Sequence, residues 1–335
     1  MDQLSATIQD SFPNKRIVIA GDLVADQFLH GTIARVSREA PVFILRHDET
    51  DTRAGAAANA AVNIASLGAE PVLVGLTGSD HNGELLLEKL RGSRVNCDFV
   101  ISDPTVRTTT KVRVLAGQHY AARQQVIRID YENRSEITET LKRQLLSNFE
   151  TAVEGADAIV ISDYNYGAAD RSVYGRALEI SKKRGIPLLI DSRFRLGDFP
   201  NATTATPNQD EVEQLLGKDF NIDQCVELRV KLGFGSLLVT CGNQGMLLIQ
   251  ADAAPVRIAA VGSIEPVDVT GAGDTVIAVY ALGLACGLSF LDAAVIANHA
   301  GGIVVMKKGT ASVSTSELVE SIRVNAKLET VESSA

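Results

Sequence analysis

The chain has 335 residues, of which 45% are hydrophobic, and its formal net charge is −9. This length can supply a substantial core in one large domain or in two. The acidic balance argues against nucleic acid or an anionic membrane as the main partner, and no apolar run reaches the roughly 18 residues of a membrane-spanning helix.

The cysteines are isolated from one another, at Cys97, Cys225, Cys241 and Cys286. None forms a Cys-x-x-Cys pair, and none stands beside a histidine at the spacing of a zinc finger. The N-terminal segment Met1–Phe12 is polar and does not resemble a signal peptide. Reduced, mostly buried thiols in a cytoplasmic protein are therefore expected.

Strand-like and helix-like segments alternate along most of the chain. Strands are predicted at Arg16–Ala20, Pro71–Leu76, Asp157–Ile161, Pro187–Ile190 and Ser236–Thr240. Helices are predicted at Gly55–Leu67, Asn82–Arg91, Arg171–Lys183, Asp210–Leu216, Ile222–Leu232 and Val276–Leu288. This alternation is typical of parallel βαβ units and predicts a three-layer α/β/α sandwich around a mostly parallel sheet.

Two regions lack the intervening helices, at about residues 28–46 and 106–130. Thr108–Leu115 and Gln124–Asp130 within them have the character of strands. We therefore expect a single domain over residues 1–335 that carries a small separate β-sheet as a lid. One face of such a sheet would need to be covered by substrate or by a second subunit.

The segment Asp268–Asp274 contains Gly271 and Gly273 and precedes a long apolar helix. Glycines let the backbone approach a ligand closely, and the free N–H groups at a helix start attract a phosphate. The carboxylate of Asp274 could accept a proton from an attacking hydroxyl. The alternative is that Asp274 only caps the helix. The pattern favours a phosphoryl-transfer site.

Over nearly its whole length the chain resembles the ribokinase (PfkB) family of carbohydrate kinases, chiefly through Asp-x-Thr-Gly-Ala-Gly-Asp at residues 268–274. The resemblance implies a ribokinase-like fold, Asp274 as catalytic base, and an anion hole formed by Gly271, Ala272 and Gly273. It also implies ATP and Mg²⁺ as cofactors. In some members a monovalent cation binds near the positions of Asp268 and Thr270.

Two further segments match the family's substrate-binding positions. Asp26 follows the first strand, and Gly55 and Asn59 match a Gly-Gly-x-x-x-Asn signature in which Ala54 replaces the first glycine. The resemblance implies that Asp26, Gly55 and Asn59 bind the sugar. A surface turn at Asp26 and a plain helix start at Gly55 are the alternatives.

Asn208 and Glu211 match the family's Asn-x-x-Glu motif, which implies that they order Mg²⁺ through water, with Asn208 also close to the nucleotide. Carboxylate and amide groups with water as the remaining ligands suit Mg²⁺. The same two residues could instead form a capping box.

Thr240, Gly242 and Gly245 match the family's Thr-x-Gly-x-x-Gly loop along the ATP phosphates, and Asn298 matches a position beside the adenine. An ordinary hairpin turn is the alternative for the loop.

One branch of the family, the heptose 7-phosphate kinases, is resembled by Val36–Val42, Thr110–Val114 and Gln124–Asp130. That resemblance implies phosphorylation of the anomeric hydroxyl of D-glycero-D-manno-heptose 7-phosphate. Such an acceptor needs fixed cations, for which Lys111, Arg113 and Arg128 are candidates. A charged, solvated strand face is the alternative for these three residues.

The chain departs from that branch at two lysine positions, where Tyr166 and the neighbourhood of Arg193 stand instead. Fructose 6-phosphate, ribose or another aldose therefore remain alternative acceptors, and a non-catalytic sugar or nucleotide sensor remains a further one. A homodimer formed through the lid is expected.

Overall fold

The computed structural model describes residues 2–118, 123–132, 136–263 and 265–332. Its main sheet has nine strands in the order β13-β12-β11-β10-β9-β8-β1-β4-β5. Their bounds are β1 Arg16–Gly21, β4 Glu70–Gly78, β5 Asn96–Asp103, β8 Ala158–Asp163, β9 Leu188–Ser192, β10 Thr204–Ala205, β11 Ser236–Thr240, β12 Met246–Gln250 and β13 Val256–Ile258.

All strands from β5 across to β11 are parallel, whereas β12 and β13 pair antiparallel at one edge. The α-helices are α1 Asp2–Ala6, α2 Ala57–Ser66, α3 His81–Gly92, α4 Glu139–Ala152, α5 Arg171–Arg184, α6 Gln209–Leu216, α7 Ile222–Leu232, α8 Ala272–Ala285, α9 Phe290–Val304 and α10 Thr315–Glu332. Short helical turns lie at Thr7–Ser11, Phe12–Asn14, Leu196–Asp198 and Gly242–Gln244.

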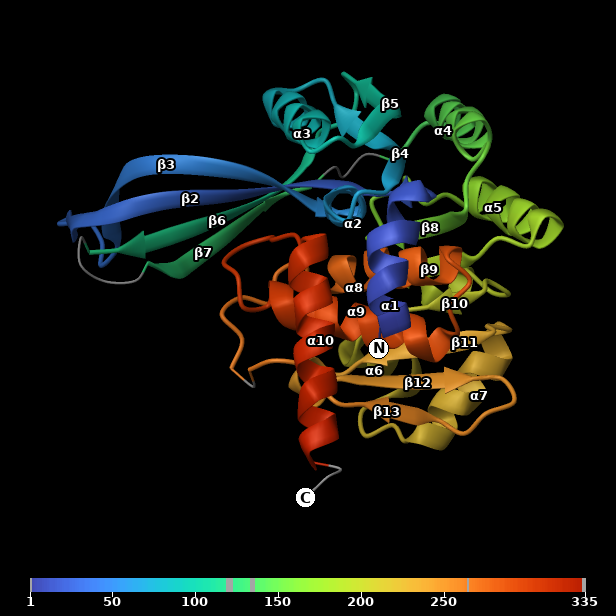
Figure 1. The fold of residues 1–335 in the computed structure, drawn as a ribbon. Helices are drawn as coiled ribbons and strands as arrows, with labels where there is room; N and C mark the ends of the chain where they lie inside the picture. The colour runs from blue at the N-terminus through green and yellow to red at the C-terminus, as the bar shows by residue number, and fades with distance from the viewer. Residues whose placement is uncertain (1, 119–122, 133–135, 264, 333–335) are drawn as a thin grey trace.

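Helices cover both faces of the main sheet (Figure 1). In β1, Ile17 and Ile19 pack into the core with α2, α8, α9 and α10, while Val18 and Ala20 pack into the opposite core with α4, α5 and α7. Side chains of a strand alternate between faces, so a strand between two helix layers must be apolar throughout. The predicted three-layer α/β/α sandwich is confirmed.

A second sheet of four strands, in the order β3-β2-β6-β7, projects from the body as a long arm (Figure 1). Its strands are β2 Leu23–Val36, β3 Phe43–Ala56, β6 Thr109–Gly117 and β7 Gln124–Tyr131. Strand β2 is antiparallel to β3 and parallel to β6. This sheet is the predicted lid; residues 119–122 of its predicted extent lie outside the described residues.

The lid strands run further into the body than the sequence indicated. Strand β3 continues through Gly55 to Ala56, and α2 begins only at Ala57, so Gly55 is a strand residue and not the first residue of a helix. Ala56 marks the change of direction with φ 55° and ψ −133°, a conformation that glycine adopts far more readily than alanine.

Candidate active site

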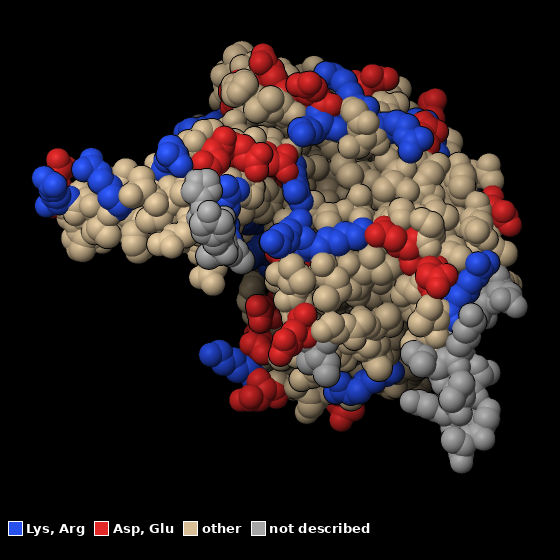
Figure 2. Space-filling model, turned by 60° about the vertical axis from the view of Figure 1, so that its left-hand side comes forward, with Lys and Arg blue, Asp and Glu red and all other residues tan. Residues whose placement is uncertain are grey.

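Polar side chains gather at the carboxyl ends of the parallel strands. Asp22 follows β1, Asp163 ends β8, Asp191 lies in β9, Thr206 follows β10 and Thr240 ends β11. Because these strands are parallel, their carboxyl ends meet at one edge of the sheet, where ligands of open α/β sheets bind. The root of the lid arm lies over this edge, and Figure 2 shows Lys and Arg side chains gathered at the recess between arm and body.

Two cavities meet at the N-terminus of α8. The first, of about 260 Å³ and called here the Asp274 cavity, lies under the lid and is lined by Gly271, Gly273 and Asp274. The second, of about 510 Å³ and called here the Asn298 cavity, is lined by Ala272, Gly273 and Asn298. Gly273 therefore faces both cavities, so a ligand in one can contact a ligand in the other at the start of α8.

The start of α8 is shaped by Gly271, which has φ 78° and forms the N-cap without a side-chain hydrogen bond. A Cβ at this position would lie 2.5 Å from Nδ2 of Asn59 and 2.7 Å from Cγ2 of Thr310, so both the backbone angle and the space require glycine. The N–H groups of the first turn have no partner within the helix, although Ala272 N–H donates to the Val269 carbonyl over 3.3 Å, and the positive end of the helix dipole lies behind them.

Asp274 is 4% exposed, and each of its carboxylate oxygens accepts a hydrogen bond. Nδ2 of Asn59 donates to Oδ2 over 2.8 Å, and the Tyr164 hydroxyl donates to Oδ1 over 2.9 Å. Burial raises the pKa of Asp274 to about 7, while these two hydrogen bonds act in the opposite direction. A carboxylate with a pKa near 7 can exchange a proton with a reacting group at neutral pH.

Asn59 therefore contacts the predicted base, and it is not among the residues that line the Asp274 cavity. Gly55 is not among them either, but it makes room for Asp26: a Cβ on Gly55 would lie 2.7 Å from Oδ2 of that aspartate. Of the three residues predicted to bind the sugar, only Asp26 lines the cavity directly.

The lid contributes Asp26, Lys111 and Arg113 to the cavity lining. A guanidinium nitrogen of Arg113 lies 2.6 Å from Oδ1 of Asp26, and the Lys111 ammonium lies 5.4 Å from the centre of the Tyr164 ring. Burial raises the pKa of Asp26, although Arg113 partly offsets this effect. Burial lowers the pKa of Lys111. These partly desolvated cations can hold an anionic group inside the cavity.

Arg128 is the one predicted cation that does not line the cavity. It lies on β7, directly opposite Arg113 in the pairing with β6. Two of its guanidinium nitrogens each lie 2.9 Å from an oxygen of Asp130. Strand β7 is the exposed outer strand of the lid.

The Asn298 cavity brings together the residues predicted for the nucleotide loop: Thr240, Gly242 and Gly245, together with Asn208. The loop is also a tight hairpin connection, in which Cys241 N–H donates to the Gly245 carbonyl over 2.8 Å. Nδ2 of Asn298 donates to the Ala259 carbonyl over 2.7 Å, which ties α9 to the segment after β13.

Asn208 and Glu211 form the capping box that the sequence left as an alternative, at the start of α6. Asn208 N–H donates to Oε2 of Glu211, and Glu211 N–H donates to Oδ1 of Asn208, both over 2.9 Å. Both residues also line the Asp274 cavity, beside Thr206. Asn208 and Glu211 can therefore cap α6 and contact a ligand at the same time, because the capped start of the helix lies at the cavity wall.

Tyr164, Asp191 and Arg193 are among the residues that line the Asp274 cavity without having been predicted as site residues. Burial raises the pKa of Asp191 well above its usual range, and the negative charges of Asp274 and Glu211 add to the effect. Their positions near the carboxyl ends of β8 and β9 were the available signal, because both strands were predicted, although with ends at Ile161 and Ile190 and not at Asp163 and Ser192.

Asp268 and Thr270 lie in the loop that leads into α8. Oδ1 of Asp268 accepts the Thr270 N–H over 3.0 Å, and Oδ2 accepts the Gly309 N–H over 2.8 Å. Thr270 also lines the Asp274 cavity. These bonds join the segment before α8 to the segment after α9.

The chain also matches a protein-family model over most of its length. Residues 27–317 match the model described as pfkB family carbohydrate kinase. The chain belongs to this family of carbohydrate kinases, and its fold is ribokinase-like. No helix in the described part of the chain is long and apolar enough to cross a membrane.

Curated relatives include the bifunctional protein HldE of Proteus mirabilis, 39% identical over 327 residues, which cover 96% of this chain and 66% of that protein. HldE of Citrobacter koseri is 40% identical, over 93% of this chain and 64% of that protein. This chain thus spans slightly less than two thirds of the length of these relatives.

Solved structures with the same fold include Arabidopsis thaliana ribokinase complexed with ribose and ATP, with a TM-score of 0.68 and 22% identity, covering 92% of this chain and 98% of that one. Escherichia coli phosphofructokinase-2 in complex with substrates and products has a TM-score of 0.72 and 19% identity, over 91% and 97%. These comparisons confirm the ribokinase-like fold.

Proposed function

We propose that this sugar kinase transfers the γ-phosphate of ATP to the anomeric hydroxyl of D-glycero-D-manno-heptose 7-phosphate, with Asp274 as the base. The observation that carries the proposal is the meeting of two cavities at Gly273, with a buried carboxylate on one side. The acceptor would occupy the Asp274 cavity and ATP the Asn298 cavity, so that the transferred group passes over the start of α8.

The chemistry follows from this arrangement. Asp274 takes the proton of the acceptor hydroxyl as its oxygen attacks the γ-phosphorus, and the bond to the bridging oxygen of ADP breaks. Backbone N–H groups of Gly271, Ala272 and Gly273 stabilise the charge on the transferred group. The lid over the cavity excludes water and so limits hydrolysis of ATP.

Mg²⁺ fits the donor set formed by Asn208, which lines both cavities, and Glu211, which lines the Asp274 cavity. Asn208 and Glu211 offer an amide and a carboxylate, and among the described residues no group of three carboxylate, histidine or cysteine side chains forms a complete metal cage. Mg²⁺ keeps several water ligands and binds phosphate oxygens, so a partial protein site suits it. When bound, it would neutralise charge on the phosphates.

A heptose phosphate is favoured by the charges of the lid and by the relatives. Lys111, Arg113 and Arg193 line the Asp274 cavity and could hold the phosphate of the acceptor. HldE proteins match at about 39% identity. A panel of heptose 7-phosphate, fructose 6-phosphate, ribose and other aldoses, assayed for ADP release, tests the acceptor. Greater activity on an unphosphorylated sugar would overturn the proposed substrate.

The base is tested by Asp274→Asn, which keeps the size of the side chain. Turnover should fall by about three orders of magnitude or more, whereas ATP binding should stay near wild type, because the carboxylate lies in the other cavity. Near-normal turnover would refute the role of Asp274. A sensor without catalysis would show no ADP release from the wild type either.

We also propose that two copies associate through their lids. Strand β7 is exposed along its length, with Val126 at 49%, Ile127 at 54% and Ile129 at 41% exposure. An apolar outer strand of this kind is a candidate for pairing. Light scattering should give twice the mass of the chain, and a monomer that persists at micromolar concentration would contradict this arrangement.

A further inference from the structure

Tyr164 contacts the proposed base from the side opposite Asn59. Its hydroxyl donates to Oδ1 of Asp274 over 2.9 Å, whereas Asn59 donates to Oδ2 over 2.8 Å. The three side chains come from α2, from the loop after β8 and from the first turn of α8. With one donor on each oxygen, the plane of the carboxylate is held from both ends.

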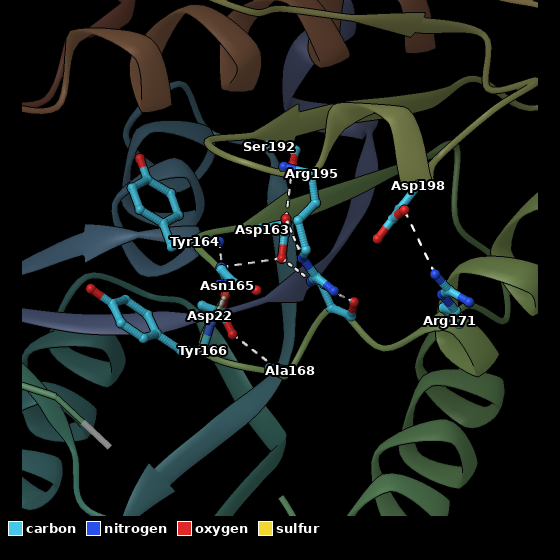
Figure 3. Close-up of polar contacts among 11 residues, drawn as sticks. Asp22, Asp163, Tyr164, Asn165, Tyr166, Ala168, Arg171, Ser192, Arg195 and Asp198 are labelled. Atoms are coloured by element: carbon cyan, nitrogen blue, oxygen red, sulfur yellow. Dashed lines mark hydrogen bonds and ion pairs between the residues drawn. The ribbon is translucent and has the colours of Figure 1, made fainter. Parts of the chain in front are cut away.

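The loop that carries Tyr164 is anchored from within by Asp22 (Figure 3). The buried carboxylate of Asp22 accepts backbone N–H groups from Tyr164 over 2.8 Å, from Tyr166 over 3.0 Å and from Ala168 over 2.9 Å. Burial raises the pKa of Asp22 to about 6, and these three bonds oppose the rise. A loop held at three points along its backbone keeps the Tyr164 side chain in one place.

The start of the same loop is fixed by a second carboxylate, that of Asp163. It accepts a hydrogen bond from the Ser192 hydroxyl over 2.8 Å, and it forms an ion pair with Arg195 (Figure 3). Asp163 is fully buried, so this pair leaves it no freedom to move toward solvent. The Tyr164 hydroxyl is therefore positioned by two carboxylates that lie outside the reacting centre.

We propose that Tyr164 is a positioning residue for the base: its hydroxyl orients the Asp274 carboxylate and stabilises its ionised form, so that the base is ready at neutral pH. This inference rests on the proposed function, in which Asp274 accepts the proton. It gives Tyr164 a role that the sequence analysis did not assign.

The surroundings of Tyr164 keep its hydroxyl protonated, so that it acts as a hydrogen-bond donor. Burial and the nearby charge of Asp274 raise the pKa of Tyr164 well above its usual range, so the phenol keeps its proton throughout the working range. Other titratable or charged groups also face Asp274 or line its cavity, and any pH profile includes their influence. They are Asp26, Lys111, Arg113, Asp191, Arg193 and Glu211.

Tyr166 supplies a matched control two residues further along. Its backbone N–H is also held by Asp22, and the Lys111 ammonium lies 5.9 Å from its ring. Its hydroxyl, however, donates to Oε1 of Glu132 over 3.1 Å, at the surface. Tyr166→Phe removes a hydroxyl from the same loop without touching the base.

The kinetic test compares wild type, Tyr164→Phe and Tyr166→Phe with MgATP and heptose 7-phosphate across the pH range. In Tyr164→Phe the acid limb of kcat/KM should move to higher pH by about one unit, the size expected for a lost hydrogen bond to a charged group. Tyr166→Phe should retain the wild-type limb. Substrate ionisations are common to all three proteins, so the differences come from the enzyme.

A second measurement needs no acceptor. In protein carrying ¹³C at aspartate side-chain carboxyl carbons, the signal lost in Asp274→Asn belongs to Asp274, and its titration midpoint should rise in Tyr164→Phe but not in Tyr166→Phe. An unchanged midpoint would overturn the inference even if the acceptor proves to be another sugar. If the midpoint rises while Asp274→Asn retains turnover, the proposed function fails and the hydrogen bond stands.

If Tyr164→Phe does not yield folded protein, fluorotyrosine incorporated in place of tyrosine provides the test in the Tyr166→Phe background. A more acidic phenol is a stronger donor, so the Asp274 midpoint should move to lower pH. A midpoint that stays in place or rises would overturn the role given to the Tyr164 hydroxyl.

Discussion

Replacing Asp274 by Asn should make the protein more stable at pH 8, even though it removes the proposed base. The carboxyl is 4% exposed, and burial raises its pKa from 3.8 to about 7. At 1.36 kcal/mol per pKa unit, that rise corresponds to roughly 4 kcal/mol of folding free energy lost when the group ionises in the folded state. Asparagine carries no such charge.

The sign follows from proton binding. Between pH 3.8 and about 7 the folded protein keeps the Asp274 proton while the unfolded chain has lost it, so the stability of the wild type falls as pH rises through this window. The stabilisation that comes from the Asp274 proton is complete below pH 3.8 and lost above about pH 7. The stability difference between Asp274→Asn and wild type should therefore grow by roughly 3 kcal/mol between pH 5 and pH 8.

Urea unfolding at pH 5, 6, 7 and 8 measures this difference, provided that the dependence on denaturant is the same for both proteins. Asp268→Asn is the control, and it should lower the stability by an amount that stays constant between pH 5 and pH 8. Although burial opposes the effect, hydrogen bonds from Thr270 and Gly309 lower the pKa of Asp268, so its carboxylate stabilises the fold above its unfolded pKa, and this is lost on acidification. A difference for Asp274→Asn that does not change with pH would refute the reasoning.

Three other substitutions probe the same region. Ala56→Gly should raise the melting temperature by a few degrees, because alanine at φ 55° and ψ −133° is strained by about 1–2 kcal/mol; a lower value in calorimetry would contradict this. Gly271→Ala should destabilise the fold and abolish turnover, because the new Cβ would lie 2.5 Å from Nδ2 of Asn59. Gly273→Ala should retain wild-type stability, since beyond the chain neighbours and the backbone of its own helix no described heavy atom lies within 4 Å of such a Cβ. It should nevertheless lower kcat at least tenfold by narrowing the anion hole, and an unchanged kcat would argue against phosphate binding there.

Sequence patterns located most elements of the sheet and its helices because each depends on local periodicity and end signals. Ser236–Thr240 and Ile222–Leu232 were predicted with the bounds that the structure has. The antiparallel edge formed by β12 and β13 was not predicted, and neither was the extension of β3 to Ala56. Both depend on pairing with distant strands, which local patterns do not encode.

The same difference between local patterns and long-range contacts applies to the prediction of the site residues. Gly271–Asp274 form a local unit, so their sequence alone predicts a helix start suited to phosphate. Arg113 and Arg128 look equivalent in the sequence, yet only Arg113 lines the Asp274 cavity. Strand β7, which carries Arg128, lies one strand further out, and Arg128 there forms hydrogen bonds with Asp130 of the same strand. Asn59 was predicted to bind sugar, and that role remains a prediction, while the structure shows its contact with Asp274.

The sequence by itself identified the carbohydrate kinase family and predicted a phosphate-binding helix start at residues 271–274. Only the tertiary structure decided what surrounds Asp274: Asn59 and Tyr164 lie 215 and 110 residues away along the chain, and each donates to one of its oxygens. The physical reason is the parallel sheet, which brings the carboxyl ends of distant strands to one edge. Burial at that edge then raises the pKa of Asp274, an effect of packing that the residue type alone does not reveal.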